Sequence, residues 1–272
     1  MPDGPRLPVR QAVLLGLVHG PAELAPVSSS AHTTLLAWQR HWRYGELDPA
    51  ARKRFEVALH AGTAVALLIV TRRGLGARKP GVVLLACVPP AIAGTLLQGP
   101  IERRLGTPPT IAAGLLGGSV AMVIADLAGG RTRVRGDARA ADGIALGLAQ
   151  ALALIPGVSR SGVTRAAARW RGFSPIEADA LSSAVGMPIT LGALALKGKQ
   201  ALGSSRGEWL PLSAGALAAF SSTLVSGSVT RQLGRSRSLL PYAAYRVVVA
   251  AAVVRRLRQN ASDDRRLRRG RR

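Results

Sequence analysis

The chain alternates long apolar stretches with short segments rich in arginine. Three stretches, 81–101, 105–125 and 209–230, contain no Asp, Glu, Lys or Arg over 21 or 22 residues. A helix of roughly 20 apolar residues crosses the hydrocarbon core of a bilayer. With less uniform apolar runs between them, the pattern predicts six transmembrane helices, at about 55–71, 80–98, 107–129, 175–196, 209–229 and 240–257. No segment has the alternation of period two that indicates a strand.

Two further apolar segments are broken in the middle by polar residues. Residues 9–25 predict a short helix that ends at Pro26, and 30–38 predict a second. Residues 140–170 show the same plan, with the break at IPGVSRSG. Neither half of either segment is long enough to span, so each predicts a re-entrant helix–turn–helix. Broken backbone at membrane depth is tolerated where protein buries it or where it lines a cavity.

The two broken segments are related by a shift of 131 positions. Residues 16–33 and 147–164 are identical at seven of eighteen positions, and the matches include three pairs of hydroxyl residues: Ser28 with Ser159, Ser30 with Ser161 and Thr33 with Thr164. Three predicted spans, an odd number, follow each broken segment. The sequence therefore predicts one all-α polytopic membrane domain, 1–272, built as an inverted repeat of about 9–129 and about 140–257.

Composition and charge support a membrane protein. The chain of 272 residues is 48% apolar yet carries a net charge of +23, as expected for spans joined by basic loops. Aromatic residues are only 4%, and the basic residues are spread over every loop, so a nucleic-acid partner is not expected. The basic tail, 258–272, is expected to lie beside anionic lipid head groups on the cytoplasmic side. The pattern indicates no particular oligomeric state.

The hydroxyl-rich turns suit a bound phosphate. Ser28–Ser30 and Ser159–Ser161 each stand at the start of a short helix, where free backbone amides and the helix dipole favour anions. Arg160 lies inside the second turn, and a guanidinium binds two phosphate oxygens at once. Because a charged residue at membrane depth is costly, Arg160 is expected to be functional or paired. The two turns together predict a phosphate pocket within the membrane.

Residues near the first turn could supply acid–base chemistry. His32 is one helical turn after Ser29, a spacing that allows an activated nucleophile or an acid for the leaving group. Glu23 could bind a divalent cation that bridges phosphate oxygens, or act as a base. His19 lies one turn before Glu23 and could instead be a packing residue. His60 stands near the start of a span, where a place at the membrane interface explains it equally well.

These motifs resemble those of the integral-membrane undecaprenyl-diphosphate phosphatases, which recycle the bacterial cell-wall carrier lipid. GLVHGPAELAPVSSSAH and LALIPGVSRSG resemble the two motifs of that family, and FEVALHAG, MPITLGA and LPYAAYRVVVAAAV extend the similarity along the chain. The resemblance implies a multi-pass protein of the bacterial plasma membrane with its pocket open to the outer face. It implies catalytic roles for Glu23, Ser29, His32 and Arg160, and substrate-binding roles for Ser28, Ser30, Ser159, Ser161, Gly162 and Thr164.

The implied activity is hydrolysis of a polyprenyl diphosphate to the monophosphate and inorganic phosphate, with a divalent cation, Mg²⁺ in the family. This chain departs from the family at His19, where an acidic or amide residue is usual, and at Ala31, where glycine is usual. An imidazole beside Glu23 predicts a softer metal site than two carboxylates would form. A transporter of lipid phosphates or other anions, or a catalytically weakened relative, is an alternative that the residues leave open.

Overall fold

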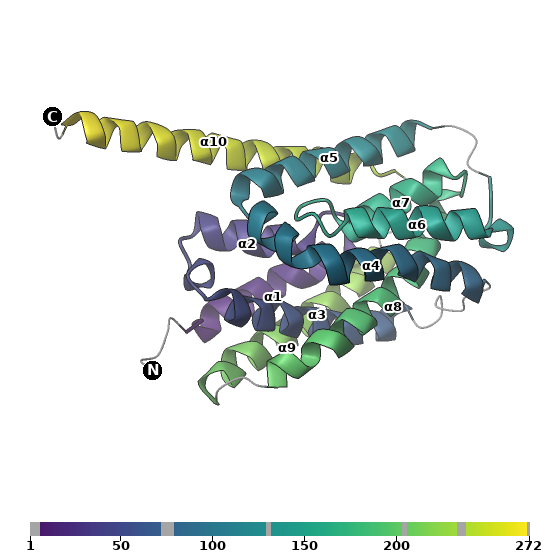
Figure 1. Cartoon of the computed structure of the whole chain (residues 1–272), viewed down its shortest axis with the longest axis horizontal. Helices are drawn as coiled ribbons and strands as arrows, with labels where there is room; N and C mark the ends of the chain where they lie inside the picture. Colours follow the sequence, from purple (N-terminus) through teal and green to yellow (C-terminus); the bar gives the residue numbers. More distant parts are fainter. Residues whose placement is uncertain (1–5, 72–78, 129–131, 203–205, 233–237, 271–272) are drawn as a thin grey trace.

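The computed structural model describes residues 6–71, 79–128, 132–202, 206–232 and 238–270. The described residues form α-helices and two short 3₁₀ turns and contain no strand, only an isolated β-bridge between Arg133 and Phe173. The α-helices are α1 Val9–Leu24, α2 Ser29–Gln39, α3 Pro49–Thr71, α4 Pro80–Leu105, α5 Pro108–Leu127, α6 Ala140–Leu152, α7 Arg160–Trp170, α8 Pro175–Leu202, α9 Arg206–Gln232 and α10 Leu240–Gly270. Figure 1 shows them as a bundle from which the end of α10 projects.

Every predicted helix is present, and several are longer than the apolar pattern indicated. α3 begins at Pro49 because Asp48 caps it, with Oδ1 accepting the amides of Ala50 and Ala51 at 2.9 Å each. The basic tail expected after residue 257 continues α10 to Gly270, since arginine is a good helix former. Residues 271–272 of that tail lie outside the described residues.

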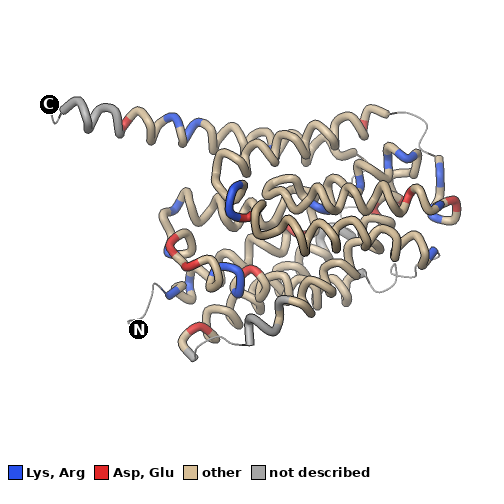
Figure 2. Tube along the Cα trace, in the orientation of Figure 1, with Lys and Arg blue, Asp and Glu red and all other residues tan. Residues whose placement is uncertain are grey.

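Four of the described helices are long and apolar enough to cross a membrane: Pro80–Leu105, Pro108–Leu127, Pro175–Leu196 and Gly207–Ser228. α4 shows how such a helix meets lipid. Its side chains Leu84, Val88, Ile92 and Leu96 recur every four residues and are 50–70% exposed. Charged residues lie mainly towards the two ends of the bundle (Figure 2). An apolar girdle between charged ends is the surface of a multi-pass membrane protein.

The first five and the last five helices are interleaved. α1 and α3 both pack against α9, α6 packs against α4, and α10 packs against α5. Figure 1 shows α10 beside α5 at one edge of the bundle. When α1–α5 are matched in order with α6–α10, α1 corresponds to α6 and α9 corresponds to α4. The α1–α9 contact then corresponds to the α6–α4 contact. Each broken segment is therefore supported by the fourth helix of the other set.

The two helix breaks have nearly the same backbone conformation. Ser28 has φ 77° and ψ 93°, and Ser159, 131 positions later, has φ 69° and ψ 107°. A positive φ is uncommon for residues other than glycine and costs about 1 kcal/mol or more. Both serines directly precede a helix, α2 or α7, so the same turn reverses the chain at both breaks.

A buried ion cluster joins α6 to the adjoining loops. Asp142, in the first turn of α6, accepts hydrogen bonds from Arg133 (2.7 Å), Arg171 (2.6 Å) and the Arg139 amide (2.9 Å). Burial alone would raise the pKa of the Asp142 carboxyl. The hydrogen bonds outweigh it and lower that pKa from 3.8 to about 2. The ionised carboxylate therefore stabilises this end of the bundle.

We expect the thermal stability contributed by Asp142 to depend on pH. Because the pKa of Asp142 is lower in the folded state, its contribution to stability is complete above the unfolded pKa of about 3.9. The contribution is lost as the pH falls towards the folded pKa of about 2. Asp142→Asn should lower the melting temperature in detergent at pH 7, and the deficit relative to wild type should shrink below about pH 4. Asp263→Asn, at an exposed position of α10, should match wild type throughout. An equal deficit at pH 7 and pH 3 would contradict the assignment.

Candidate active site

The centre of the site is the carboxylate of Glu23, on α1 just before the first break. Ser29 Oγ donates to Glu23 Oε2 at 2.6 Å, and Arg160 Nη2 donates to Glu23 Oε1 at 2.8 Å. Ser29 begins α2, and Arg160 begins α7 on the far side of the second break. The Glu23 side chain is 10% exposed and the Arg160 side chain 27%. The structure therefore brings the two predicted turns together around one carboxylate.

Close backbone contact fixes α1 in this position. Gly16 and Gly20 lie against α9, where a Cβ on Gly16 would come within 2.8 Å of Ala218 Cβ and one on Gly20 within 2.6 Å of the Thr223 amide nitrogen. Only glycine allows helices to approach so closely. The position of Glu23, one turn after Gly20, is thus set by packing between the two halves of the chain.

Arg246 of α10 holds the two breaks to each other. Its guanidinium is fully buried and donates to carbonyl oxygens on both, at 3.2 Å to Pro26, 3.0 Å to Gly157 and 3.1 Å to Val158. It also donates to Leu115 of α5 at 3.0 Å. Carbonyls released by a helix break need donors when water is excluded. Arg246 was not among the predicted site residues, although a lone arginine in an apolar run is a signal for such a role.

His32 makes different contacts from those its spacing suggested. Its Nδ1 lies 2.8 Å from the Ser28 carbonyl oxygen and its Nε2 lies 2.8 Å from the Tyr245 hydroxyl. Because a carbonyl can only accept, Nδ1 carries the proton. In the neutral imidazole Nε2 then accepts from the Tyr245 hydroxyl. Ser29 is paired with Glu23 rather than with His32, so Glu23 is the nearer base. Tyr245 is a partner that sequence reasoning missed.

The predicted phosphate-binding residues divide into two groups. Ser30 is exposed and Ser161 half-buried, so both can meet a ligand, whereas Ser28 and Ser159 are buried at the breaks. Ser159 Oγ accepts the Gly162 amide at 3.3 Å and caps α7. Thr164 is fully buried, and its hydroxyl lies 2.6 Å from that of Ser182 on α8. This placement gives Thr164 a role in packing α7 against α8.

Three potential metal ligands adjoin the site. His19 and Glu23 of α1 and His60 of α3 place one donor atom each within 4.8 Å of one another. The rings of His19 and His60 meet edge to face with centroids 4.7 Å apart. The predicted pair of His19 and Glu23 is thus joined by a third residue, His60, which was not predicted as a metal ligand.

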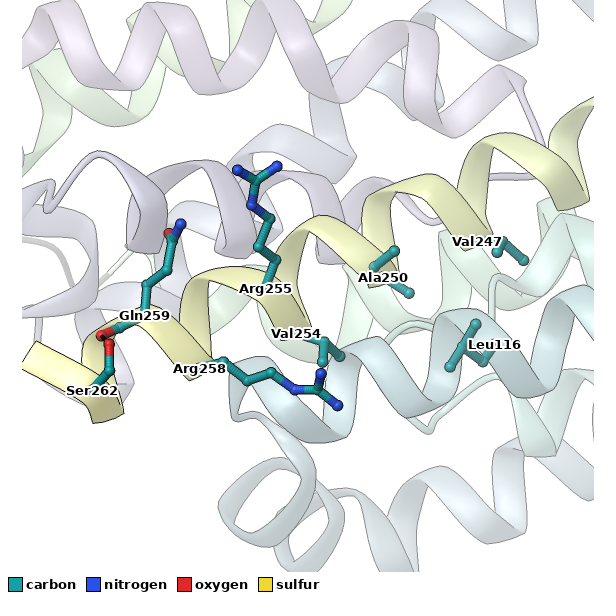
Figure 3. Close-up of a pocket in the computed structure, with 9 residues that line it drawn as sticks. Leu116, Val247, Ala250, Val254, Arg255, Arg258, Gln259 and Ser262 are labelled. Carbon is teal, nitrogen blue, oxygen red and sulfur yellow. Dashed lines mark hydrogen bonds between the residues drawn. The ribbon is translucent and has the colours of Figure 1, made fainter.

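A groove of about 600 Å³ lies elsewhere, along α10 and α5. Leu116, Val247 and Val254 form an apolar part, and Arg255 and Arg258 extend from α10 nearby (Figure 3). None of the residues that line this groove belongs to the cluster around Glu23. This groove is therefore separate from the cluster at the junction of the two breaks.

Fold and site together define an integral membrane protein with a cluster of polar side chains between two broken helices. A sequence profile of the family described as "Bacitracin resistance protein BacA" matches residues 12–252, and the chain belongs to that family. It is 35% identical over 264 residues to an undecaprenyl-diphosphatase of Geobacter metallireducens, covering 89% of this chain and 96% of the relative. It is 36% identical over 269 residues to the Geobacter sulfurreducens protein of the same name, covering 90% and 97%.

The packing around Arg246 predicts a clear difference between two neighbouring glycines of α5. A Cβ on Gly118 would overlap the Arg246 guanidinium and lie 2.5 Å from the Val158 carbonyl oxygen, whereas a Cβ on Gly117 would meet nothing within 4 Å. Gly118→Ala should therefore lower the free energy of unfolding by about 1–3 kcal/mol. Gly117→Ala should leave it unchanged or raise it by up to about 1 kcal/mol, because alanine is the better helix former. Thermal unfolding of both variants in detergent measures this, and equal melting temperatures would refute the close contact.

Proposed function

We propose that this protein hydrolyses a polyprenyl diphosphate, such as undecaprenyl diphosphate, to the polyprenyl monophosphate and inorganic phosphate. The hydrogen bond from Ser29 to Glu23 carries the proposal, because it joins a hydroxyl to a base at the start of a helix. The names of the relatives support the same reaction. The proposed product is the carrier lipid of cell-wall synthesis in its monophosphate form, and the family that the chain belongs to is described by bacitracin resistance.

The reaction follows from the residues around Glu23. Ser29 Oγ attacks the terminal phosphorus while Glu23 accepts its proton, and the bond from that phosphorus to the bridging oxygen breaks. Polyprenyl monophosphate leaves, and water then releases phosphate from Ser29. Phosphoryl transfer depends chiefly on positioning and on neutralising charge. Arg160 supplies that charge, since a guanidinium with several donors can bind Glu23 and phosphate oxygens together.

Other residues of the site bind and orient the substrate. The exposed Ser30 and half-buried Ser161 stand at the starts of α2 and α7, where the first backbone amides have no partner within their own helix. Both helix starts favour a phosphate. The His32 imidazole and the Tyr245 hydroxyl, 2.8 Å apart near the start of α2, would help to orient the substrate. His19, Glu23 and His60 would hold a divalent cation, which would neutralise further charge on phosphate oxygens.

We also propose that α1–α5 and α6–α10 form an inverted repeat with six membrane-crossing helices and two re-entrant elements. The matching contacts α1–α9 and α6–α4 and the matching conformations of Ser28 and Ser159 support it. In this arrangement α3 and α10 would cross beside the four more apolar helices. A binding site near the midplane is also typical of transporters. The pairing of Ser29 with Glu23 favours hydrolysis, since transport needs no activated hydroxyl.

Ser29→Ala should lower kcat for phosphate release from a polyprenyl diphosphate by at least about 1000-fold, because it removes the attacking group. Ser213→Ala is the matched control: within the described part of the chain its hydroxyl bonds only to carbonyls of its own helix, α9, at 2.8 and 3.1 Å. The control should retain full activity. Brief reaction of wild type with labelled substrate should place label on Ser29. Wild-type turnover by Ser29→Ala would exclude Ser29 as the nucleophile.

Gly186→Ala tests the position of Arg160. A Cβ on Gly186 of α8 would overlap the Arg160 guanidinium, whereas a Cβ on Gly192 of the same helix would meet nothing within 4 Å. Because the overlap falls on the end of a flexible side chain, the protein should stay folded while Arg160 moves. We expect kcat to fall by about 10-fold or more, and by at most the roughly 100–1000-fold that is typical of removing such a donor. Gly192→Ala should be unaffected, and equal activity in both variants would argue against this role.

A further inference from the structure

The histidine and glutamate cluster between α1 and α3 has a buried atom without a partner. His19 is 2% exposed, and its buried Nδ1 has no hydrogen-bond partner among the residues that the structure describes. Buried polar atoms are almost always bonded, so each exception calls for an explanation such as a bound ion. His19 lies in the same cluster as Glu23 and His60, whose donor atoms are all within 4.8 Å of one another.

The chemistry of these donors selects among metal ions. Mg²⁺ is bound through oxygen ligands and retains much of its water, so two imidazoles and one carboxylate suit it poorly. Imidazole nitrogen suits Zn²⁺ and neighbouring first-row ions, and two histidines with one glutamate are a known catalytic zinc set. We propose that His19, His60 and Glu23 bind one first-row transition-metal ion of the Zn²⁺ type in preference to Mg²⁺.

The geometry is compatible with such an ion. Metal–nitrogen and metal–oxygen bonds of about 2.0–2.2 Å place tetrahedral ligand atoms roughly 3.4 Å apart, so small side-chain rotations would bring the three donors together. Glu23 can coordinate while it keeps its bonds to Ser29 and Arg160, because a carboxylate offers about four acceptor positions. Three protein ligands leave an open coordination position for water or a phosphate oxygen.

This inference deepens the proposed function, and it rests on that function only for the catalytic role of the ion. A metal site here would share the carboxylate that binds the attacking hydroxyl. Packing alone, without a metal ion, would also place the rings of His19 and His60 edge to face. The two explanations differ in one measurable property, which is the affinity of the protein for a transition metal.

The test is metal binding by the full-length protein, purified in detergent through a tag without histidine and stripped with a chelator. Titration with Co²⁺ should give an intense visible ligand-field spectrum at one ion per chain. Zn²⁺ should displace Co²⁺, and a large excess of Mg²⁺ should not. His19→Gln and His60→Gln should each weaken Co²⁺ binding by at least about 100-fold, because even supporting residues of metal sites contribute 10–100-fold.

His41→Asn is the matched control, since His41 is exposed and has φ 51°, a backbone region that asparagine tolerates. It should bind Co²⁺ as wild type does. X-ray absorption of the Zn²⁺-loaded wild type should show two imidazoles and needs no variant. A featureless Co²⁺ spectrum, displacement by Mg²⁺, or absence of imidazole scattering would overturn the proposal.

The same preparations separate this inference from the proposed function. Phosphate release without selective Co²⁺ or Zn²⁺ binding would contradict the metal assignment and leave the hydrolase intact. Tight binding of Zn²⁺ through the two histidines, with no release of phosphate from polyprenyl diphosphate under any metal, would contradict the hydrolase and leave the metal site intact.

Discussion

The hydrogen bonds of Arg246 are the interaction on which the arrangement of the site depends. Breaking a helix inside a membrane leaves carbonyl oxygens with no partner in their own segment and no water to replace it. The guanidinium of Arg246 donates to such carbonyls on both breaks, at Pro26 and at Gly157 and Val158. One side chain thus satisfies two costly turns and fixes the distance between them.

Because the breaks are held together, a carboxylate from one half can be shared with an arginine from the other. Glu23 precedes the first break, and Arg160 follows the second, 137 residues later. Neither half contains the whole cluster: the first supplies the Glu23 carboxylate and the Ser29 hydroxyl, and the second supplies the Arg160 guanidinium. A buried charge pair of this kind is expensive to form and to break, so the site and the junction of the halves are stabilised together.

Much of the helical arrangement could be predicted from the sequence. Runs without charge predicted the helices, because lipid accepts only long apolar segments. Hydroxyls at equivalent breaks predicted two similar turns, and the structure gives Ser28 and Ser159 nearly equal backbone angles. Helix ends were less predictable. α10 continues to Gly270, past the end of its predicted apolar span at residue 257, since helix propensity and hydropathy are separate properties of arginine.

The sequence alone determined which residues are chemically exceptional: Glu23, Ser29, His32 and Arg160 are polar groups in an apolar setting, and such groups are costly unless they have partners. Which partners they take was decided by the tertiary structure. Spacing placed His32 one turn from Ser29, yet Ser29 bonds to Glu23 and His32 to Tyr245, 213 residues away. Local periodicity describes one helix face, whereas a hydrogen bond between distant segments depends on how whole helices pack.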